Sequence, residues 1–195
     1  MLSAAMRRRP APILLSLLAT IAAAGALAAC GEEAEPSGVG GTSIVVAEAV
    51  EGEPLEVGEL GYNVGITRFL NPADAEDSEY LVGMSAPGPG TGYLGVFMTI
   101  ENESEVARPS ASQYTVVDTT GEDYEVVESE SPYALEVGAE VPAEGELPLP
   151  DTTAQTGPNH GVLLVFLVDD TVSDNRPLVL EVEGFEGTGE IILDI

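Results

Sequence analysis

The sequence predicts an all-β domain, a β-sandwich or barrel, that follows an export leader and a short tether. Short apolar runs alternate along the chain, and Gly- and Pro-containing turn signals separate them. Of the 14 prolines, all but Pro10 and Pro12 follow the leader, and their spacing leaves little room for a long helix. The chain after position 29 is long enough to bury one hydrophobic core.

The first 29 residues have the plan of a signal peptide. Arg7, Arg8 and Arg9 form a positive region, Ile13–Leu27 is mostly apolar, and small residues follow it. An uncleaved transmembrane helix is the alternative, because the apolar stretch is nearly long enough to span a bilayer. Leu27-Ala28-Ala29-Cys30 resembles the lipobox of bacterial lipoproteins, which favours cleavage.

That resemblance implies cleavage between Ala29 and Cys30 and a diacylglyceryl group on the Cys30 thiol. Cys30 is the only cysteine, so it has no partner for an intramolecular disulfide. Each buried lipid methylene contributes about 0.8 kcal/mol, and two acyl chains anchor a protein stably. We therefore expect attachment to the outer face of the cell membrane through this lipid.

Residues 30–41 are expected to be a flexible tether, because Gly31–Gly41 is glycine-rich and acidic without apolar periodicity. Such a chain spans roughly 20 Å. Residues 42–195 form the predicted domain. Its expected strands, in order, are Ile44–Val50, Tyr62–Phe69, Tyr93–Glu101, Gln113–Val117, Tyr124–Val127, Val162–Val168, Leu178–Val182 and Ile191–Ile195.

Two of these strands are especially informative. Tyr93–Glu101 is the longest alternating segment, with Val96 and Met98 on one face and Phe97 on the other. Val162–Val168 is continuously apolar, which is typical of a strand buried on both faces. Asp118–Glu122 contains Gly121 and is expected to be a hairpin connection.

Three segments resemble a bacterial immunoglobulin-like domain of unknown function: Tyr93–Ser104 with its Asn-x-Ser end, the Tyr114–Asp118 strand with Gly121 and Tyr124, and the Val141–Leu147 turn. The resemblance covers roughly residues 60–183. It implies an immunoglobulin-like antiparallel β-sandwich found in lipoproteins of Gram-positive bacteria, including actinobacteria, and similar in fold to small secreted mycobacterial antigens. It implies no catalytic residues.

Charge excludes two classes of partner. After the leader, three arginines face 34 acidic residues, a formal net charge of −31. Such a field repels nucleic-acid phosphates and anionic lipid headgroups. Actinobacterial members of the family are sometimes labelled telomeric-repeat-binding-factor-like, and this charge contradicts DNA binding. Arg68, Arg108 and Arg176 are each expected to pair with a carboxylate.

Candidate chemistry is sparse. His160 is the only histidine and the best active-site candidate, but no Gly-x-Ser-x-Gly elbow accompanies it, and a surface position is expected. Two acidic loops, Asp74–Glu79 and Asp169–Asn175, lack the spacing of a calcium-binding EF-hand, so solvated turns are expected. Their weak calcium candidates are Asp74, Asp77, Asp169, Asp170 and Asp174. We expect no bound metal, no cofactor and no enzymatic activity.

A Pro/Gly loop before the longest strand, with Pro87, Gly88, Pro89 and Gly90, is the first candidate for a contact surface. The alternative is a simple connector. The sequence thus predicts a lipid-anchored, non-enzymatic module that contacts another envelope protein. The alternatives are a cation- or ligand-binding lipoprotein that uses its acidic loops, and a hydrolase that uses His160. The Asn102-Glu103-Ser104 glycosylation pattern is interpreted as chance.

Overall fold

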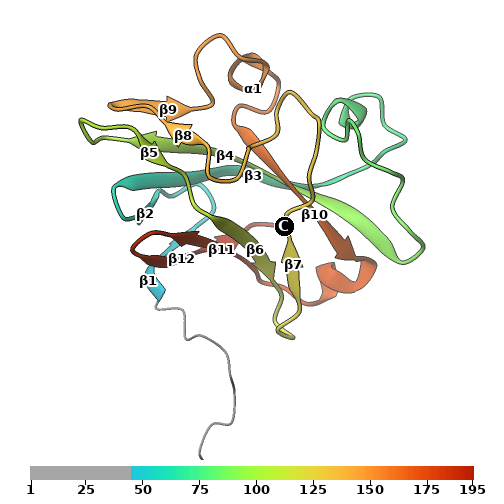
Figure 1. Ribbon diagram of the computed structural model, residues 1–195. Helices are drawn as coiled ribbons and strands as arrows, with labels where there is room; N and C mark the ends of the chain where they lie inside the picture. Colours follow the sequence, from blue (N-terminus) through green and yellow to red (C-terminus); the bar gives the residue numbers. More distant parts are fainter. Residues whose placement is uncertain (1–44) are drawn as a thin grey trace, which may run out of the picture. The chain divides into compact units, whose positions relative to one another are not determined.

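The structure, a computed structural model, describes residues 45–195 (Figure 1). The predicted leader, the Cys30 lipid site, the tether and the first residues of the predicted domain lie outside the described residues. Within the described part, no helix is long and apolar enough to cross a membrane. The regular elements of the domain are almost all strands, so the prediction of an all-β sandwich is confirmed.

Sheet A has five strands, in the spatial order β1 (Val45–Val50), β12 (Gly187–Leu193), β11 (Leu178–Gly184), β6 (Gln113–Val117) and β7 (Asp123–Glu125). Its pairings are antiparallel except for that of β1 with β12, the first and last strands among residues 45–195, which run parallel. Because β1 lies at the edge, one side of its backbone remains open to pairing.

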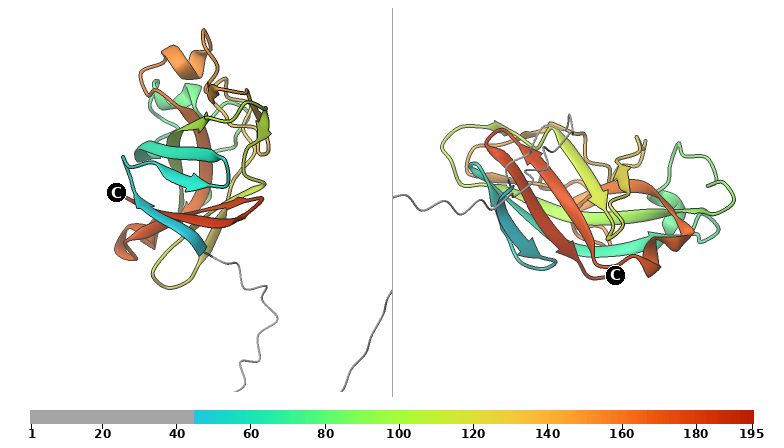
Figure 2. Two further views of the ribbon diagram at one scale, coloured as in Figure 1. Left: turned by 90° about the vertical axis from the view of Figure 1, so that its left-hand side faces the viewer. Right: turned by 90° about the horizontal axis from the view of Figure 1, so that it is seen from below.

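Sheet B has the order β10 (Val162–Asp169), β4 (Thr91–Asn102), β3 (Leu60–Leu70) and β2 (Leu55–Val57), and β9 (Gly145–Leu147) pairs with the end of β4. A separate ribbon joins β5 (Arg108–Pro109) to β8 (Glu140–Val141). The helical turns are η1 (Asp77–Glu79), α1 (Thr153–Thr156) and η2 (Asp170–Asp174). Figure 2 shows the two sheets from the side and from below.

The inner faces of the two sheets form the main core. Alternation along the strands places every second side chain between the sheets. Tyr62 of β3 meets Tyr114 of β6 edge-on, with ring centroids 6.4 Å apart, and both side chains are almost fully buried. The Leu180 and Ile191 side chains of sheet A are also fully buried.

The outer face of sheet B is covered as well, by the segments around η1 and after β7. Tyr80 packs edge-on against Phe97 of β4 at 5.0 Å and against Tyr133 at 4.8 Å. The Arg68 guanidinium lies 5.8 Å from the centre of the Tyr80 ring. Both faces of β4 and of most of β10 are therefore buried, as their apolar sequence predicts.

The predicted strands are all present, with shifted ends in some cases. Gln113–Val117 is matched in full, whereas the last strand begins at Gly187 and ends at Leu193. In the predicted Tyr124–Val127 strand, β7 ends at Glu125 and Val126 forms an isolated bridge with Phe166. The sequence does not predict β2, β5, β8 or β9, because two or three residues are too few to show a period.

Candidate functional site

The most distinctive surface lies where β4 ends, and we call it the hairpin end. It comprises the β2–β3 turn, the β5 and β8–β9 segments and the β11–β12 hairpin (Figure 1). The loops that precede β4 lie at the opposite end of that strand (Figure 1). Strand β1 starts beside the β11–β12 hairpin, since Val45 pairs with Thr188. The described chain therefore begins at the hairpin end.

Phe185 occupies the tip of the β11–β12 hairpin and is completely exposed, with 104% relative accessibility. Beside it lies a cavity of about 250 Å³ with mainly apolar walls, to which Val57, Leu60 and Tyr62 contribute. The cavity lies between the β2–β3 turn of sheet B and the hairpin of sheet A. Aromatic side chains dominate the energetics of many protein interfaces, and this one stands beside an apolar cavity.

One cation stands at the rim of this cavity. The Arg108 guanidinium, which is about 40% exposed, forms an ion pair with the exposed carboxylate of Glu59. Because the pair neutralises Arg108, the remaining rim charge is negative and includes Glu186. A partner that reaches the cavity therefore meets an apolar floor with an acidic border.

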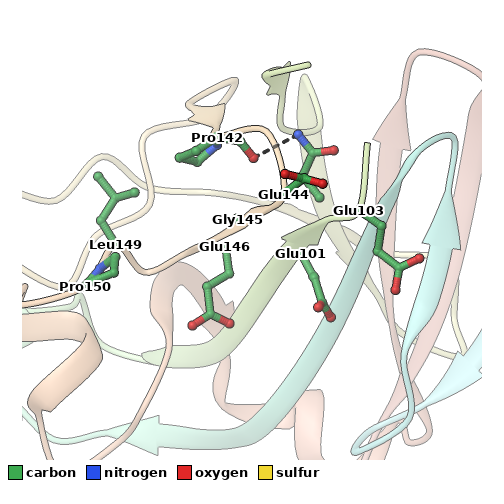
Figure 3. A pocket seen from close by; sticks show the side chains of 9 residues that line it. Glu101, Glu103, Pro142, Glu144, Gly145, Glu146, Leu149 and Pro150 are labelled. Carbon is green, nitrogen blue, oxygen red and sulfur yellow. Dashed lines mark hydrogen bonds between the residues drawn. The ribbon is translucent and has the colours of Figure 1, made fainter. Parts of the chain in front are cut away.

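A second, acidic depression of about 720 Å³ adjoins the end of β4 (Figure 3). Glu101 and Glu146 stand directly opposite each other on β4 and β9, and Glu103 and Glu144 lie close by. Leu149 and Pro150 supply its apolar part (Figure 3). This acidic wall extends the negative rim of the hairpin end.

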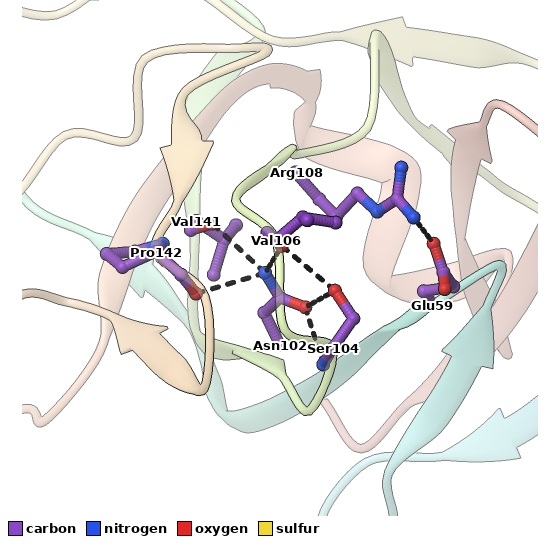
Figure 4. A network of polar contacts seen from close by, with 7 residues as sticks. All are labelled: Glu59, Asn102, Ser104, Val106, Arg108, Val141 and Pro142. Atoms are coloured by element: carbon purple, nitrogen blue, oxygen red, sulfur yellow. Dashed lines mark hydrogen bonds and ion pairs between the residues drawn. The ribbon is translucent and has the colours of Figure 1, made fainter.

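Asn102 holds the hairpin end together. Its side-chain amide donates to the backbone carbonyls of Val106 at 2.9 Å, Val141 at 3.2 Å and Pro142 at 3.0 Å (Figure 4). Its side-chain oxygen accepts from the backbone N–H of Ser104 at 3.0 Å and from the Ser104 hydroxyl at 2.7 Å. Asn102 is 1% exposed, so the glycosylation-like pattern is a buried structural turn.

Two of the weak calcium candidates accept hydrogen bonds within the fold, and the other three are exposed around η2. Asp77 is buried, pairs with Arg68 and accepts a 2.7 Å hydrogen bond from the Asn71 backbone. Asp74 accepts from the Glu76 backbone at 2.9 Å. Asp169, Asp170 and Asp174 are exposed around η2. Among residues 45–195, no group of three or more His, Cys, Asp or Glu side chains is placed to hold a metal ion.

His160 is exposed in the loop before β10. Its neighbour Asn159 donates to the Tyr80 hydroxyl at 3.0 Å, whereas no described hydrogen bond or ion pair involves the His160 ring. The alternative of a hydrolase that uses His160 stays a prediction.

The Pro87–Gly90 loop directly precedes the start of β4, whereas the hairpin end lies where β4 ends. Gly88, Pro89 and Gly90 are exposed and Pro87 is half-buried. The Gly88 carbonyl accepts from the Thr91 backbone at 3.2 Å, and the Gly90 carbonyl accepts from the Asp170 backbone at 3.0 Å. The loop therefore connects β4 to η2, and its role as a contact surface stays a prediction.

The arginine predictions are correct in two of three cases. Arg68 pairs with Asp77 and Arg108 with Glu59, whereas Arg176 donates to the backbone oxygens of Ser173 and Ile195, both at 2.7 Å. Sequence reasoning missed Phe185. The Gly184-Phe185-Glu186-Gly187 stretch, an aromatic residue within a tight turn, was the available signal.

Comparisons with known proteins give no assignment. No family model matches the chain, and no curated protein matches it. The solved structures that resemble it include an uncharacterized β-sandwich protein from Clostridium difficile, with 12% identity over 76% of this chain and 94% of the other at a TM-score of 0.47. The secreted protein MPT63 from Mycobacterium tuberculosis has 14% identity over 76% and 96%, with a TM-score of 0.44.

A Bacillus subtilis protein described as a candidate lipoprotein, ycdA, has 11% identity over 74% of this chain and 38% of its own, with a TM-score of 0.45. With TM-scores below 0.5, these likenesses carry no argument about function. The resemblance to an immunoglobulin-like lipoprotein family therefore stays an expectation.

Proposed function

We propose that this protein is a lipid-anchored module on the outer face of the cell membrane and binds another envelope protein without catalysing a reaction. The leader and Cys30 support the location at the membrane, because they have the order of a lipoprotein signal. The completely exposed Phe185 beside an apolar cavity is the observation that carries the binding function.

The hairpin end has the composition of a protein-binding site. An aromatic anchor and an apolar cavity form its centre, and charged residues form its border, which is the arrangement typical of interface hot spots. The acidic border and the neutralised Arg108 favour a partner that presents an apolar side chain flanked by Lys or Arg.

Crosslinking in intact cells tests this function. We expect the wild-type lipoprotein to capture a reproducible envelope protein, and Phe185→Ala to lose that capture, because the anchor is removed without disturbing buried residues. Phe69→Ala is the matched control, since Phe69 is a partly exposed phenylalanine away from the hairpin end, 44% accessible. Equal capture by wild type and Phe185→Ala would refute the site.

The anchor is tested separately. Cys30→Ala is expected to abolish partitioning into detergent, because the thiol that accepts the lipid is removed. Unchanged partitioning of that variant would refute the lipid assignment and would leave the test of the hairpin end unaffected.

A further inference from the structure

The outer face of sheet A carries two straight rows of side chains that cross the strands. The register pairs Glu48 with Glu190, and Glu190 with Glu181, so three carboxylates stand on successive strands. Cross-strand partners point to the same side of a sheet, and the buried partners of this sheet, such as Leu180 and Ile191, point to the other. Burial and the neighbouring carboxylates, Glu190 first, raise the pKa of Glu181.

The second row is apolar and is displaced from the glutamate row by two residues on β1, β12 and β11. Val50 pairs with Ile192, Ile192 with Val179, and Val179 with Val117. Val50 and Ile192 are each 43% exposed, and Val179 and Val117 are half-buried. This apolar row crosses four strands of the outer face of sheet A.

From this pairing of rows we infer that the outer face of sheet A docks a basic amphipathic helix of another protein. The apolar row accepts the helix's apolar stripe, and the Glu48–Glu190–Glu181 row accepts a neighbouring stripe of Lys or Arg. This inference concerns a surface separate from the hairpin end and goes beyond the proposed function.

The spacing of the rows favours a helix over an extended peptide. Neighbouring strands lie about 4.8 Å apart, so the three glutamates repeat at about that interval. Helical residues at i, i+3 and i+4 have Cβ atoms about 5–6 Å apart, whereas residues on one face of an extended strand repeat at about 6.6–6.8 Å. A helix laid across the strands therefore matches the carboxylate row better.

Charge selects the partner. Carboxylates placed directly opposite one another destabilise a sheet, and cations placed over them relieve that repulsion. A second copy of this chain would bring a like-charged row against this one, so self-association through this face is unfavourable. A basic partner is the occupant that both rows accommodate.

The test uses the purified full-length chain and three synthetic helical peptides. The first has a leucine stripe beside a lysine stripe at i, i+4 spacing, the second has the same composition with the order scrambled, and the third has glutamate in place of lysine. We expect the first to bind most tightly in a fluorescence-anisotropy titration, with affinity that falls as salt is added. Equal binding of the scrambled peptide, or no binding of the first, would overturn the inference.

Matched variants locate the binding surface. Glu181→Gln with Glu190→Gln should weaken binding of the first peptide roughly fivefold, because two exposed charge pairs are lost. Glu76→Gln with Glu79→Gln is the control, since these two exposed carboxylates lie at η1, outside both sheet A and the hairpin end. Similar weakening by both double variants would show nonspecific attraction and refute the docking face.

The apolar row has its own pair of variants. Ile192→Ser should weaken binding roughly fivefold, whereas Ile66→Ser, at an exposed isoleucine of sheet B, should leave it unchanged. Amide chemical shifts recorded with the first peptide should change on β1, β12, β11 and β6. Changes confined to other strands would refute the face even if the peptide binds.

Discussion

The side-chain amide of Asn175 donates a 2.9 Å hydrogen bond to the carboxylate of Asp118. These residues are far apart in the sequence, and the bond joins the β6–β7 turn to the segment between η2 and β11. The other carboxylate oxygen of Asp118 accepts from the Thr120 backbone at 2.8 Å, from the Thr120 hydroxyl at 2.6 Å and from the Glu122 backbone at 3.1 Å. These hydrogen bonds, above all that from the Thr120 hydroxyl, lower the pKa of Asp118 to about 2.

Asp118 should therefore make the stability of the domain depend on pH in the acid range. Its pKa in the folded state lies below the ordinary value of 3.8, so the contribution is fully present above about pH 4 and is lost as the pH falls towards 2. Asp118→Asn should lose less stability between pH 4 and pH 2 than wild type in urea unfolding. Asp123→Asn, an exposed carboxylate of the same hairpin, is the control. Parallel losses in wild type and Asp118→Asn would contradict this prediction.

The buried tyrosines Tyr62 and Tyr114 should make the stability of the domain depend on pH in the alkaline range. Burial raises the pKa of Tyr62 to about 12, and burial also raises the pKa of Tyr114. Since a raised tyrosine pKa favours the protonated folded state, stability is fully present below pH 10 and falls as the pH rises towards 12. For Tyr62 the loss amounts to about 2–3 kcal/mol. Urea unfolding followed by circular dichroism should show a smaller loss of unfolding free energy between pH 10 and pH 12 for Tyr62→Phe than for wild type. The same dependence on pH in both proteins would contradict this prediction.

Glu190→Lys should stabilise the domain by about 1 kcal/mol, because it replaces two like-charge pairs, with Glu48 and Glu181, by opposite-charge pairs. Thermal unfolding at low salt measures the change, which should shrink at high salt. Glu183→Lys is the control on the same face, because its cross-strand partners are Thr188 and Gln113. If both substitutions raise Tm equally, net charge and not register is responsible.

Asn102→Ala should destabilise the protein by about 3 kcal/mol, because it leaves the backbone carbonyls of a buried turn without donors. Urea unfolding measures the loss. Ser104→Ala should cost less, since the Ser104 hydroxyl is only partly buried and the Asn102 amide keeps its acceptors. Equal losses would show that the amide does not hold the hairpin end.

Local patterns in the sequence predict much of this fold. Apolar alternation in Tyr93–Glu101 and the continuous apolar run in Val162–Val168 predict two neighbouring buried strands, because side-chain period and burial are properties of each segment. Gly121, at φ 82°, marks a turn that few other residues could form. The net charge and the residues around Cys30 likewise depend only on the chain itself.

Only the tertiary structure decided which residues face one another. Glu48 lies far along the chain from the hairpin that carries Glu181 and Glu190, and strand register alone aligns the three beside the apolar row. Phe185 is recognisable in the sequence as a turn residue, but its place beside a cavity depends on the packing of β2 and β3 against the hairpin. Sequence periodicity reports the face on which a side chain lies, whereas the identity of its cross-strand neighbour depends on topology and register.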